Sequence, residues 1–199
     1  MRYESKRIIV YVMCLLVWPL GLPSYLAHKW FGNEALFESS AKILSLIPGK
    51  IGQYIRAAFY KMTLTECHCD LMVGFCSFFA QPTVKAGRGV GMGSFTIVGT
   101  SVLGDGVLIG SRVSVLSGKY QHGSFLRGPA VSSEGRFEPI TVGAGSWIGE
   151  GAIVMASLGQ HCMVSAGSVV TKPAPDRVLA VGNPARFLKS TDSADDQAA

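Results

Sequence analysis

Large apolar residues recur every six positions in the second half of the chain. The first block with this period contains Val73, Phe79, Ile97, Leu103, Ile109 and Val115. The second block contains Val142, Ile148 and Val154 and, after a slip, Leu158, Val164 and Val170. Small or short branched residues recur four positions later, at Ser77, Thr83, Ser101, Val107, Val113, Ser146, Ala152, Cys162 and Ser168. A period of six fits neither an α-helix nor an alternating strand.

This period predicts a solenoid with short strands on flat faces. One apolar side chain per strand points inward and stacks on its counterpart in the next coil. Glycine directly follows Val73, Leu103 and Ile109, where it lets the backbone turn a corner. Lys85 and Gly91 occupy apolar positions of the phase, so we expect one irregular coil there.

Three segments follow one another in the C-terminal part of the repeat: SWIG at 146–149, AGSVVTK at 166–172 and VGNPAR at 181–186. With the repeat, they make the chain similar to the hexapeptide-repeat acyltransferases, and in particular to the acetyl-CoA-dependent sugar and polysaccharide O-acetyltransferases. The resemblance covers roughly residues 73–189. It implies an all-β solenoid, a left-handed parallel β-helix with three hexapeptides per coil, behind an N-terminal hydrophobic and helical extension.

The same resemblance implies two groups of residues that bind acetyl-CoA. Trp147 and the turn formed by Ala166 and Gly167 would line the pantetheine, and Thr171, Lys172 and Arg186 would lie near the nucleotide phosphates. The residue types agree, because backbone amides at glycine turns can pair with the amide-bearing arm and cations can meet phosphate charge. The alternatives are that Trp147 is a surface aromatic between subunits and Arg186 a solvated cation.

His122 is the candidate catalytic residue. The six-residue phase ends just before it, and we expect a loop over 119–140 to protrude from the solenoid. In the family, a histidine at the base of such a loop deprotonates the acceptor hydroxyl, as a neutral imidazole can do near pH 7. The family often has histidine where this chain has Tyr120, so both positions stay open. Glu134 and Glu138 are the carboxylates that could orient the imidazole.

The N-terminal segment is apolar. Residues 8–27 carry no charge, while basic residues precede and follow them. Twenty such residues are long enough to cross a bilayer, but Pro19, Gly21 and Pro23 leave a straight helical run of only about eleven residues. A membrane span, an in-plane anchor, a cleaved secretory signal and a helix buried in an oligomer interface all remain open.

Residues 34–61 follow a helical period that is interrupted at Pro48-Gly49, which predicts two amphipathic helices. Lys50, Arg56 and Lys61 lie opposite the apolar face of the second helix. That helix either rests on a lipid interface or lies against the main domain. We therefore expect an apolar anchor with amphipathic helices over 1–70, the β-helix domain over 71–189 and a flexible acidic tail over 190–199.

Charge and cysteine content exclude other classes. The net charge of +5 is spread along the chain without basic runs interleaved with aromatics, so nucleic acid is not an expected partner. The five cysteines form no paired framework, and the spacing of Cys67, Cys69 and Cys76 differs from that of structural zinc sites, so we expect reduced thiols and no metal.

These observations predict an enzyme that moves an acetyl group from acetyl-CoA to a sugar hydroxyl, in surface or exopolysaccharide biosynthesis. The family forms homotrimers, so we expect a homotrimer. Acetyl-CoA is cytoplasmic, and the apolar segment 8–27 favours contact with the inner face of the cytoplasmic membrane. The alternatives are an O-acetyltransferase for antibiotics or other small molecules and a non-catalytic β-helix scaffold at a membrane assembly.

Overall fold

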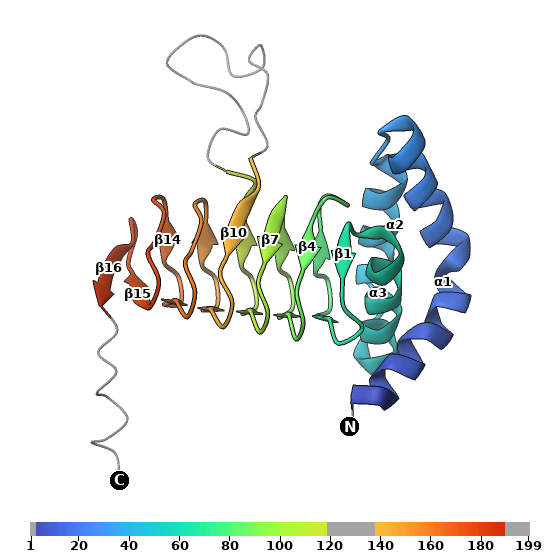
Figure 1. Ribbon diagram of the computed structural model, residues 1–199, viewed down its shortest axis with the longest axis horizontal. Helices are drawn as coiled ribbons and strands as arrows, with labels where there is room; N and C mark the ends of the chain where they lie inside the picture. Colours follow the sequence, from blue (N-terminus) through green and yellow to red (C-terminus); the bar gives the residue numbers. More distant parts are fainter. Residues whose placement is uncertain (1–2, 119–137, 190–199) are drawn as a thin grey trace.

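The chain folds into a three-sided β-helix with three helices at its N-terminal end (Figure 1). Two of the helices cover the first coil, and the third lies on these two. The structure is a computed structural model and describes residues 3–118 and 138–189. One face is a four-stranded sheet in the order β1 (Glu66–Cys67), β4 (Lys85–Ala86), β7 (Ser101–Leu103) and β10 (Ile140–Val142). A second face is a five-stranded sheet in the order β14 (Val169–Val170), β12 (Ile153–Val154), β9 (Ser114–Val115), β6 (Ile97–Val98) and β3 (Phe78–Phe79).

The third face is a seven-stranded sheet. Its order is β16 (Arg186–Lys189), β15 (Val178–Val181), β13 (Met163–Val164), β11 (Trp147–Ile148), β8 (Leu108–Ile109), β5 (Gly91–Met92) and β2 (Met72–Val73). All pairings in the three sheets are parallel except that of β15 with β16. This architecture is the predicted left-handed β-helix with a helical extension, so the predicted fold is confirmed.

Each short strand places its first side chain outward and its second inward. Ile153 is 37% exposed whereas Val154 is 0% exposed. The inward residues stack in register from coil to coil, and the column on the five-stranded face consists of Phe79, Val98, Val115, Val154 and Val170. These columns of buried aliphatic side chains form the core of the β-helix.

The phase of the first coils differs from the predicted one. Ile97 was expected to point inward, but it is 44% exposed and Val98 fills the core instead. The inward residues of this coil are Ala86, Met92 and Val98, each one position later than the six-residue period gives. A charged Lys85 is costly to bury, and a shift of one residue exchanges it for Ala86. For the same reason Val84, not the exposed Thr83, occupies the small position.

The parallel sheet begins earlier than residue 71, because β1 already pairs with β4. The helices before it are α1 (Tyr3–Phe31), α2 (Ala35–Ser45) and α3 (Gly49–Thr63). The two amphipathic helices predicted around Pro48-Gly49 are thus present. An aromatic cluster of Phe37, Phe59, Tyr60 and Phe79 joins them to the first coil, with ring centroids 4.9 to 6.2 Å apart.

Helix α1 runs unbroken through Pro19 and Pro23, so the predicted interruption after Trp18 was wrong. The two prolines are four residues apart and both are exposed, which puts them on one side of the helix, away from the packed face. The backbone disturbance that proline causes therefore falls on the outer side. The inner side, with Val10, Val17 and Ser24 buried, continues without a gap.

Arg56 also differs from expectation. It was placed on the polar side of its helix, but it is 2% exposed and holds the helices to the β-helix. Its Nε donates to the carbonyl oxygen of Val73 at 3.0 Å, and Nη1 donates to those of Leu44 at 3.2 Å and Ile47 at 2.7 Å. These carbonyls lie at the C-terminal end of α2 and in the first coil, where a cation is favourable. Burial lowers the pKa of the guanidinium.

We expect Arg56→Met to lower the free energy of unfolding by about 3 kcal/mol, because several buried carbonyls lose their donor together. Chemical denaturation followed by circular dichroism measures the change. Lys50→Met is the matched control, since Lys50 is exposed and bonds only to Gln53 among the contacts the structure describes. Equal stability of the two variants would contradict a structural role for Arg56.

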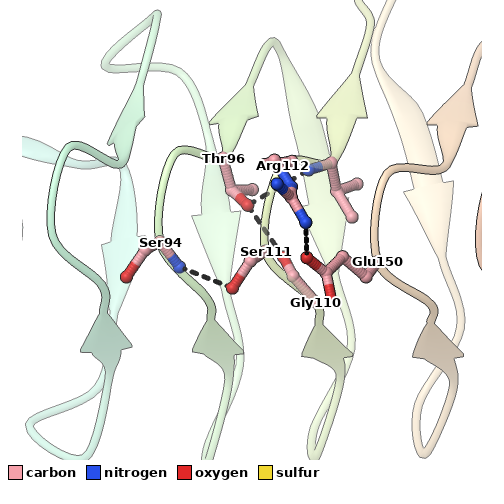
Figure 2. A network of polar contacts seen from close by, with 7 residues as sticks. Ser94, Thr96, Gly110, Ser111, Arg112 and Glu150 are labelled. Carbon is pink, nitrogen blue, oxygen red and sulfur yellow. Dashed lines mark hydrogen bonds and ion pairs between the residues drawn. The ribbon is translucent and has the colours of Figure 1, made fainter.

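A network of polar contacts connects successive coils at one corner of the β-helix (Figure 2). The Ser94 amide donates to Ser111 Oγ at 3.1 Å, and Thr96 Oγ1 donates to the Gly110 carbonyl at 2.8 Å. Arg112 forms an ion pair with Glu150 in the next coil. Because the chain between these two residues includes 119–137, the pair links the coils on either side of that insertion. Both side chains are exposed, so the pair contributes little to stability.

Candidate functional site

A cavity of about 210 Å3 lies where the chain leaves the β-helix at Gly118 and re-enters it at Glu138. The Glu138 amide donates to the Ser117 carbonyl at 3.1 Å, which holds the two stems together. The wall of the cavity consists of Gly118, Glu138, Pro139, Ile140, Met155, Ala156, Ser157, Thr171 and Pro173. Glu138, one of the two predicted carboxylates, is therefore at this cavity.

The cavity forms because successive coils have corners of different length at this edge of the β-helix. Across this corner, Leu103 is the next inward residue five positions after Val98, whereas Leu158 is the next inward residue only four positions after Val154. The shorter corners cut inside the longer ones, so 155–157 and 171–173 form a recess below the stems. The slip after Val154 is visible in the sequence, but Met155 and Ser157 were not among the predicted site residues.

A second cavity, of about 530 Å3, adjoins the first, since Thr171 borders both. Its wall consists of Thr171, Lys172, Val181, Gly182, Asn183, Pro184, Ala185 and Arg186. Three predicted phosphate-binding residues, Thr171, Lys172 and Arg186, thus lie around one hollow. Among the described residues that line it, none is acidic, so both cations act on an uncompensated surface.

Backbone hydrogen bonds position this second wall. The Val169 amide donates to the Gly182 carbonyl at 2.9 Å, and the Ala185 amide donates to the Val169 carbonyl at 2.8 Å. Ser168 Oγ accepts from the Gly182 amide at 3.0 Å. Gly182 has φ +97°, which strongly favours glycine. The segment therefore lies along β14 before β16 turns back, and that turn brings Arg186 to the cavity that Lys172 lines.

The predicted pantetheine residues lie elsewhere on the protomer. Trp147 points outward from β11 and is 48% exposed. Ala166 and Gly167 are exposed at the corner between β13 and β14. None of the three lines either cavity. Of the six predicted cofactor residues, Thr171, Lys172 and Arg186 thus line the second cavity of one described protomer and the other three do not.

The other catalytic candidates, His122, Glu134 and the competing Tyr120, lie outside the described residues. Cys67 and Cys69 are buried, and burial raises the pKa of the Cys67 thiol to about 12. Within residues 3–118 and 138–189, no cluster of three or more His, Cys, Asp or Glu side chains is arranged to hold a metal ion. The chemistry that the described site offers is anion binding beside a pocket with one carboxylate.

Comparisons with known proteins agree with the repeat. Residues 139–172 match the family model described as the hexapeptide repeat of succinyl-transferase. A curated relative, serine acetyltransferase 4 of Arabidopsis thaliana, is 31% identical over 117 residues, covering 58% of this chain and 30% of the relative. The chain spans less than half the length of each of the first curated relatives that it matches.

Two solved structures share the fold. A maltose O-acetyltransferase from Clostridium difficile 630 superposes with a TM-score of 0.69 at 22% identity, covering 83% of this chain and 90% of that one. A galactoside acetyltransferase in complex with coenzyme A gives a TM-score of 0.62 at 22% identity, covering 77% and 78%. Fold and repeat together define a left-handed β-helix protein of the hexapeptide-repeat type. Within that class, the resemblance to the hexapeptide-repeat acyltransferases is confirmed.

Proposed function

We propose that this protein transfers an acetyl group from acetyl-CoA to a hydroxyl of a sugar. The observation that carries the proposal is the convergence of Thr171, Lys172 and Arg186 on an open, non-acidic cavity next to the cavity at the loop stems. A cofactor with several phosphates fits the cavity lined by Lys172 and Arg186, and an acceptor fits the cavity at the loop stems. Relatives that act on maltose, galactosides and serine support acetyl transfer to a hydroxyl.

In this proposal Lys172 and Arg186 hold the phosphates of acetyl-CoA through charge-assisted hydrogen bonds. The residues that line the cavity supply further backbone donors and acceptors along 181–186. Acetyl-CoA supplies the thioester that the acceptor oxygen attacks. No covalent enzyme intermediate is needed, because the acceptor oxygen can attack the thioester carbon directly once its proton has an acceptor.

We assign His122 as the general base that accepts the proton of the acceptor hydroxyl. Four peptide units separate His122 from Gly118, so the covalent chain keeps their Cα atoms within about 14 Å of one another. Gly118 and Glu138 both line the first cavity, which supports a role for the Glu138 carboxylate in orienting the imidazole. A neutral imidazole with a pKa near 6.5 accepts the hydroxyl proton and later returns it to the leaving thiolate.

We also propose a homotrimer. Trp147 and Ala166 line neither cavity of one protomer, and a subunit boundary at the cofactor site would let them reach the same acetyl-CoA as Lys172 and Arg186 of a neighbour. Both the five-stranded and the seven-stranded faces carry exposed apolar side chains in register, namely Ile97 and Ile153 on one and Leu108, Trp147 and Met163 on the other. Packing the first face of one subunit on the second face of the next is a head-to-tail contact that can close a ring of three.

The acceptor that we propose is a sugar unit of a surface or exopolysaccharide, modified on the cytoplasmic side of the membrane where acetyl-CoA is available. The apolar helix α1 supports work at a membrane. An antibiotic or another small molecule as acceptor is the second candidate, because the cavity at the stems is open. A non-catalytic scaffold would need none of the cations around the second cavity.

A donor comparison tests the cofactor site. We expect Lys172→Gln and Arg186→Gln each to raise the KM for acetyl-CoA about tenfold, the loss of one charge-assisted contact. The KM for acetyl-pantetheine, which has no nucleotide phosphates, should stay unchanged. Lys85→Gln, an exposed lysine on the four-stranded face, is the matched control.

Thiol release measures these constants, with maltose-type sugars, lipid-linked sugars, serine and chloramphenicol-type alcohols as acceptors. Equal changes with both donors would place Lys172 and Arg186 away from the phosphates. A chain that binds no acetyl-CoA and releases no thiol with any acceptor would favour the scaffold.

A further inference from the structure

Helix α1 is the outermost element of the helical end of the molecule. In Figure 1 it lies across the end of the β-helix, with α2 and α3 between it and the first coil. It is the one helix in the described part of the chain that is long and apolar enough, from Lys6 to Phe31, to cross a membrane. The contacts of α1 distinguish a membrane span from an in-plane anchor or a helix buried in an oligomer interface.

The inner face of α1 is packed on the rest of the fold along most of its length. Val10 and Val17 are 0% and 5% exposed, and both belong to the continuous hydrophobic core. At Gly21 the contact with α3 is close, because a Cβ atom there would lie 3.1 Å from Met62 Cε. Ser24 is buried beside Ser40 of α2. To span a bilayer, α1 would have to leave these contacts and expose the core below it.

The outer face of α1 is apolar and uncovered. Its exposed large side chains are Ile8, Tyr11, Val12, Leu15, Leu16, Trp18, Leu20, Leu22, Tyr25, Trp30 and Phe31. No charged residue interrupts them between positions 8 and 27. A helix that packs one side on a core and meets water on the other normally carries charged residues on its outer side. A patch of this extent marks an interaction surface.

The width of this surface identifies its partner as lipid. At 100° per residue, the exposed side chains from Trp18 through Leu15 and Ile8 to Leu16 cover an arc of about 160°. A paired helix from a second copy covers a narrower seam. A bilayer surface, in contrast, covers the whole outer side of a helix that lies in it.

The charges around this surface point to anionic lipid. Apart from the buried Arg56, residues 3–63 carry six Lys and Arg against three Asp and Glu. Lys6 and Lys50 line one hollow at the edge of the helical end, together with a single acidic residue, Asp70. At the other end of α1, Lys29 donates to the Tyr25 hydroxyl at 3.0 Å, next to the exposed Trp30 and Phe31. Aromatic and basic residues together at the ends of an apolar surface are typical of a membrane interface.

We infer that α1 lies in the plane of the membrane surface and docks the molecule by its helical end, so that the β-helix stands away from the bilayer. The inference refines the membrane contact proposed above and does not depend on acetyl transfer. The outer side chains of α1 enter the region between headgroups and acyl chains, while Val10, Val17 and Gly21 keep their contacts with the fold.

Flotation with vesicles tests the docking. The full chain should float with vesicles of phosphatidylcholine and phosphatidylglycerol, and less well with phosphatidylcholine alone. We expect Ile8→Glu with Leu15→Glu to lower the bound fraction at least tenfold, with an unchanged circular dichroism spectrum. Leu188→Glu places one such charge at an exposed apolar residue on the opposite end and should bind as the wild type does.

Wild-type binding by the Ile8 and Leu15 variant would overturn the docking surface. A fall in particle mass in that variant, with vesicle binding retained, would assign the surface to a second copy. Thiol release is measured separately on the same preparations, so a failed docking and a failed acetyl transfer are distinguishable.

Depth-dependent fluorescence quenching tests the orientation. Trp18 lies near the middle of the apolar run and Trp30 near its end, and Trp147 is the third tryptophan of the chain. Variants that keep only Trp18 or only Trp30, with the others replaced by Phe, should both be quenched most by lipids brominated near the headgroup. Stronger quenching of Trp18 by bromine near the bilayer centre, with Trp30 at the interface, would show a spanning helix and overturn the inference.

Discussion

Replacing His122 with alanine is expected to lower the rate of acetyl transfer by about 10²- to 10⁴-fold, the usual worth of a general base. The imidazole acts on the acceptor hydroxyl, so the dissociation constant for acetyl-CoA should not change. Steady-state thiol release gives kcat, and equilibrium binding of CoA gives the dissociation constant. The pocket at which we propose that the imidazole acts is the one between the stems at Gly118 and Glu138.

The pH profile gives this prediction a second readout. Since the base must be neutral, the wild-type rate should fall as the pH drops below about 6.5. The alanine variant should lose this dependence. Tyr120→Phe is the matched control, because Tyr120 is the competing position two residues away. A His122→Ala enzyme with more than a tenth of wild-type turnover, or a Tyr120→Phe enzyme with the larger loss, would assign the base elsewhere.

The second large effect is expected from breaking the trimer. Ile153→Arg places a charge on the outer side of the five-stranded face, where Ile153 is 37% exposed and shares the outward column with Ile97 and Ser114. If that face packs on the seven-stranded face of a neighbour, the charge is buried without a partner, which the contact cannot tolerate. Light scattering should show the mass falling to that of the 21.2 kDa protomer, and transfer should fall at least 100-fold.

Val102→Arg is the matched control for this experiment. Val102 is 38% exposed on the four-stranded face, which the proposed contact leaves free. The control variant should keep both mass and activity. An active protomer of Ile153→Arg would show that one chain contains a whole site.

Complementation between variants tests the shared site directly. Trp147→Ala and the double variant Lys172→Gln, Arg186→Gln should each transfer poorly when alone. In mixed trimers, about a quarter of the subunit boundaries should pair an intact Trp147 with an intact Lys172 and Arg186. Activity should therefore recover on co-expression, whereas a site within one chain would stay inactive.

The repeat could be predicted from sequence where each hexapeptide carries its own signal. From Val142 to Val170 the predicted inward residues are those that are buried, including the slip to Leu158. Relative to the six-residue period, one corner after Phe79 is a residue longer and one corner before Leu103 is a residue shorter. Every residue between these two corners therefore points to the opposite side of the sheet from the one predicted. The charge at Lys85 marked the irregular coil, but the inward position of Val98 depended on the coils above and below it.

Other features depend on tertiary contacts that local patterns do not contain. The helical position of Arg56 resembled that of a surface cation, and its burial follows from the carbonyls that converge on it from α2 and the first coil. The prolines of α1 indicated a break because their outer position was unknown. The cofactor signature reads as one ordered series along the chain, whereas the corners of a solenoid distribute the same residues over different faces.

The antiparallel strand β16 has a consequence for the behaviour of the protein in the cell. A parallel solenoid ends in open strand edges, on which another solenoid can stack and grow into a fibre. Here the last coil is closed on two faces, by β16 along β15 and by the segment 182–185 along β14, and the first coil is covered by α2 and α3. In the described residues, these elements cover much of each end of the solenoid, which disfavours end-to-end stacking of coils and leaves the side faces as the main surfaces for association.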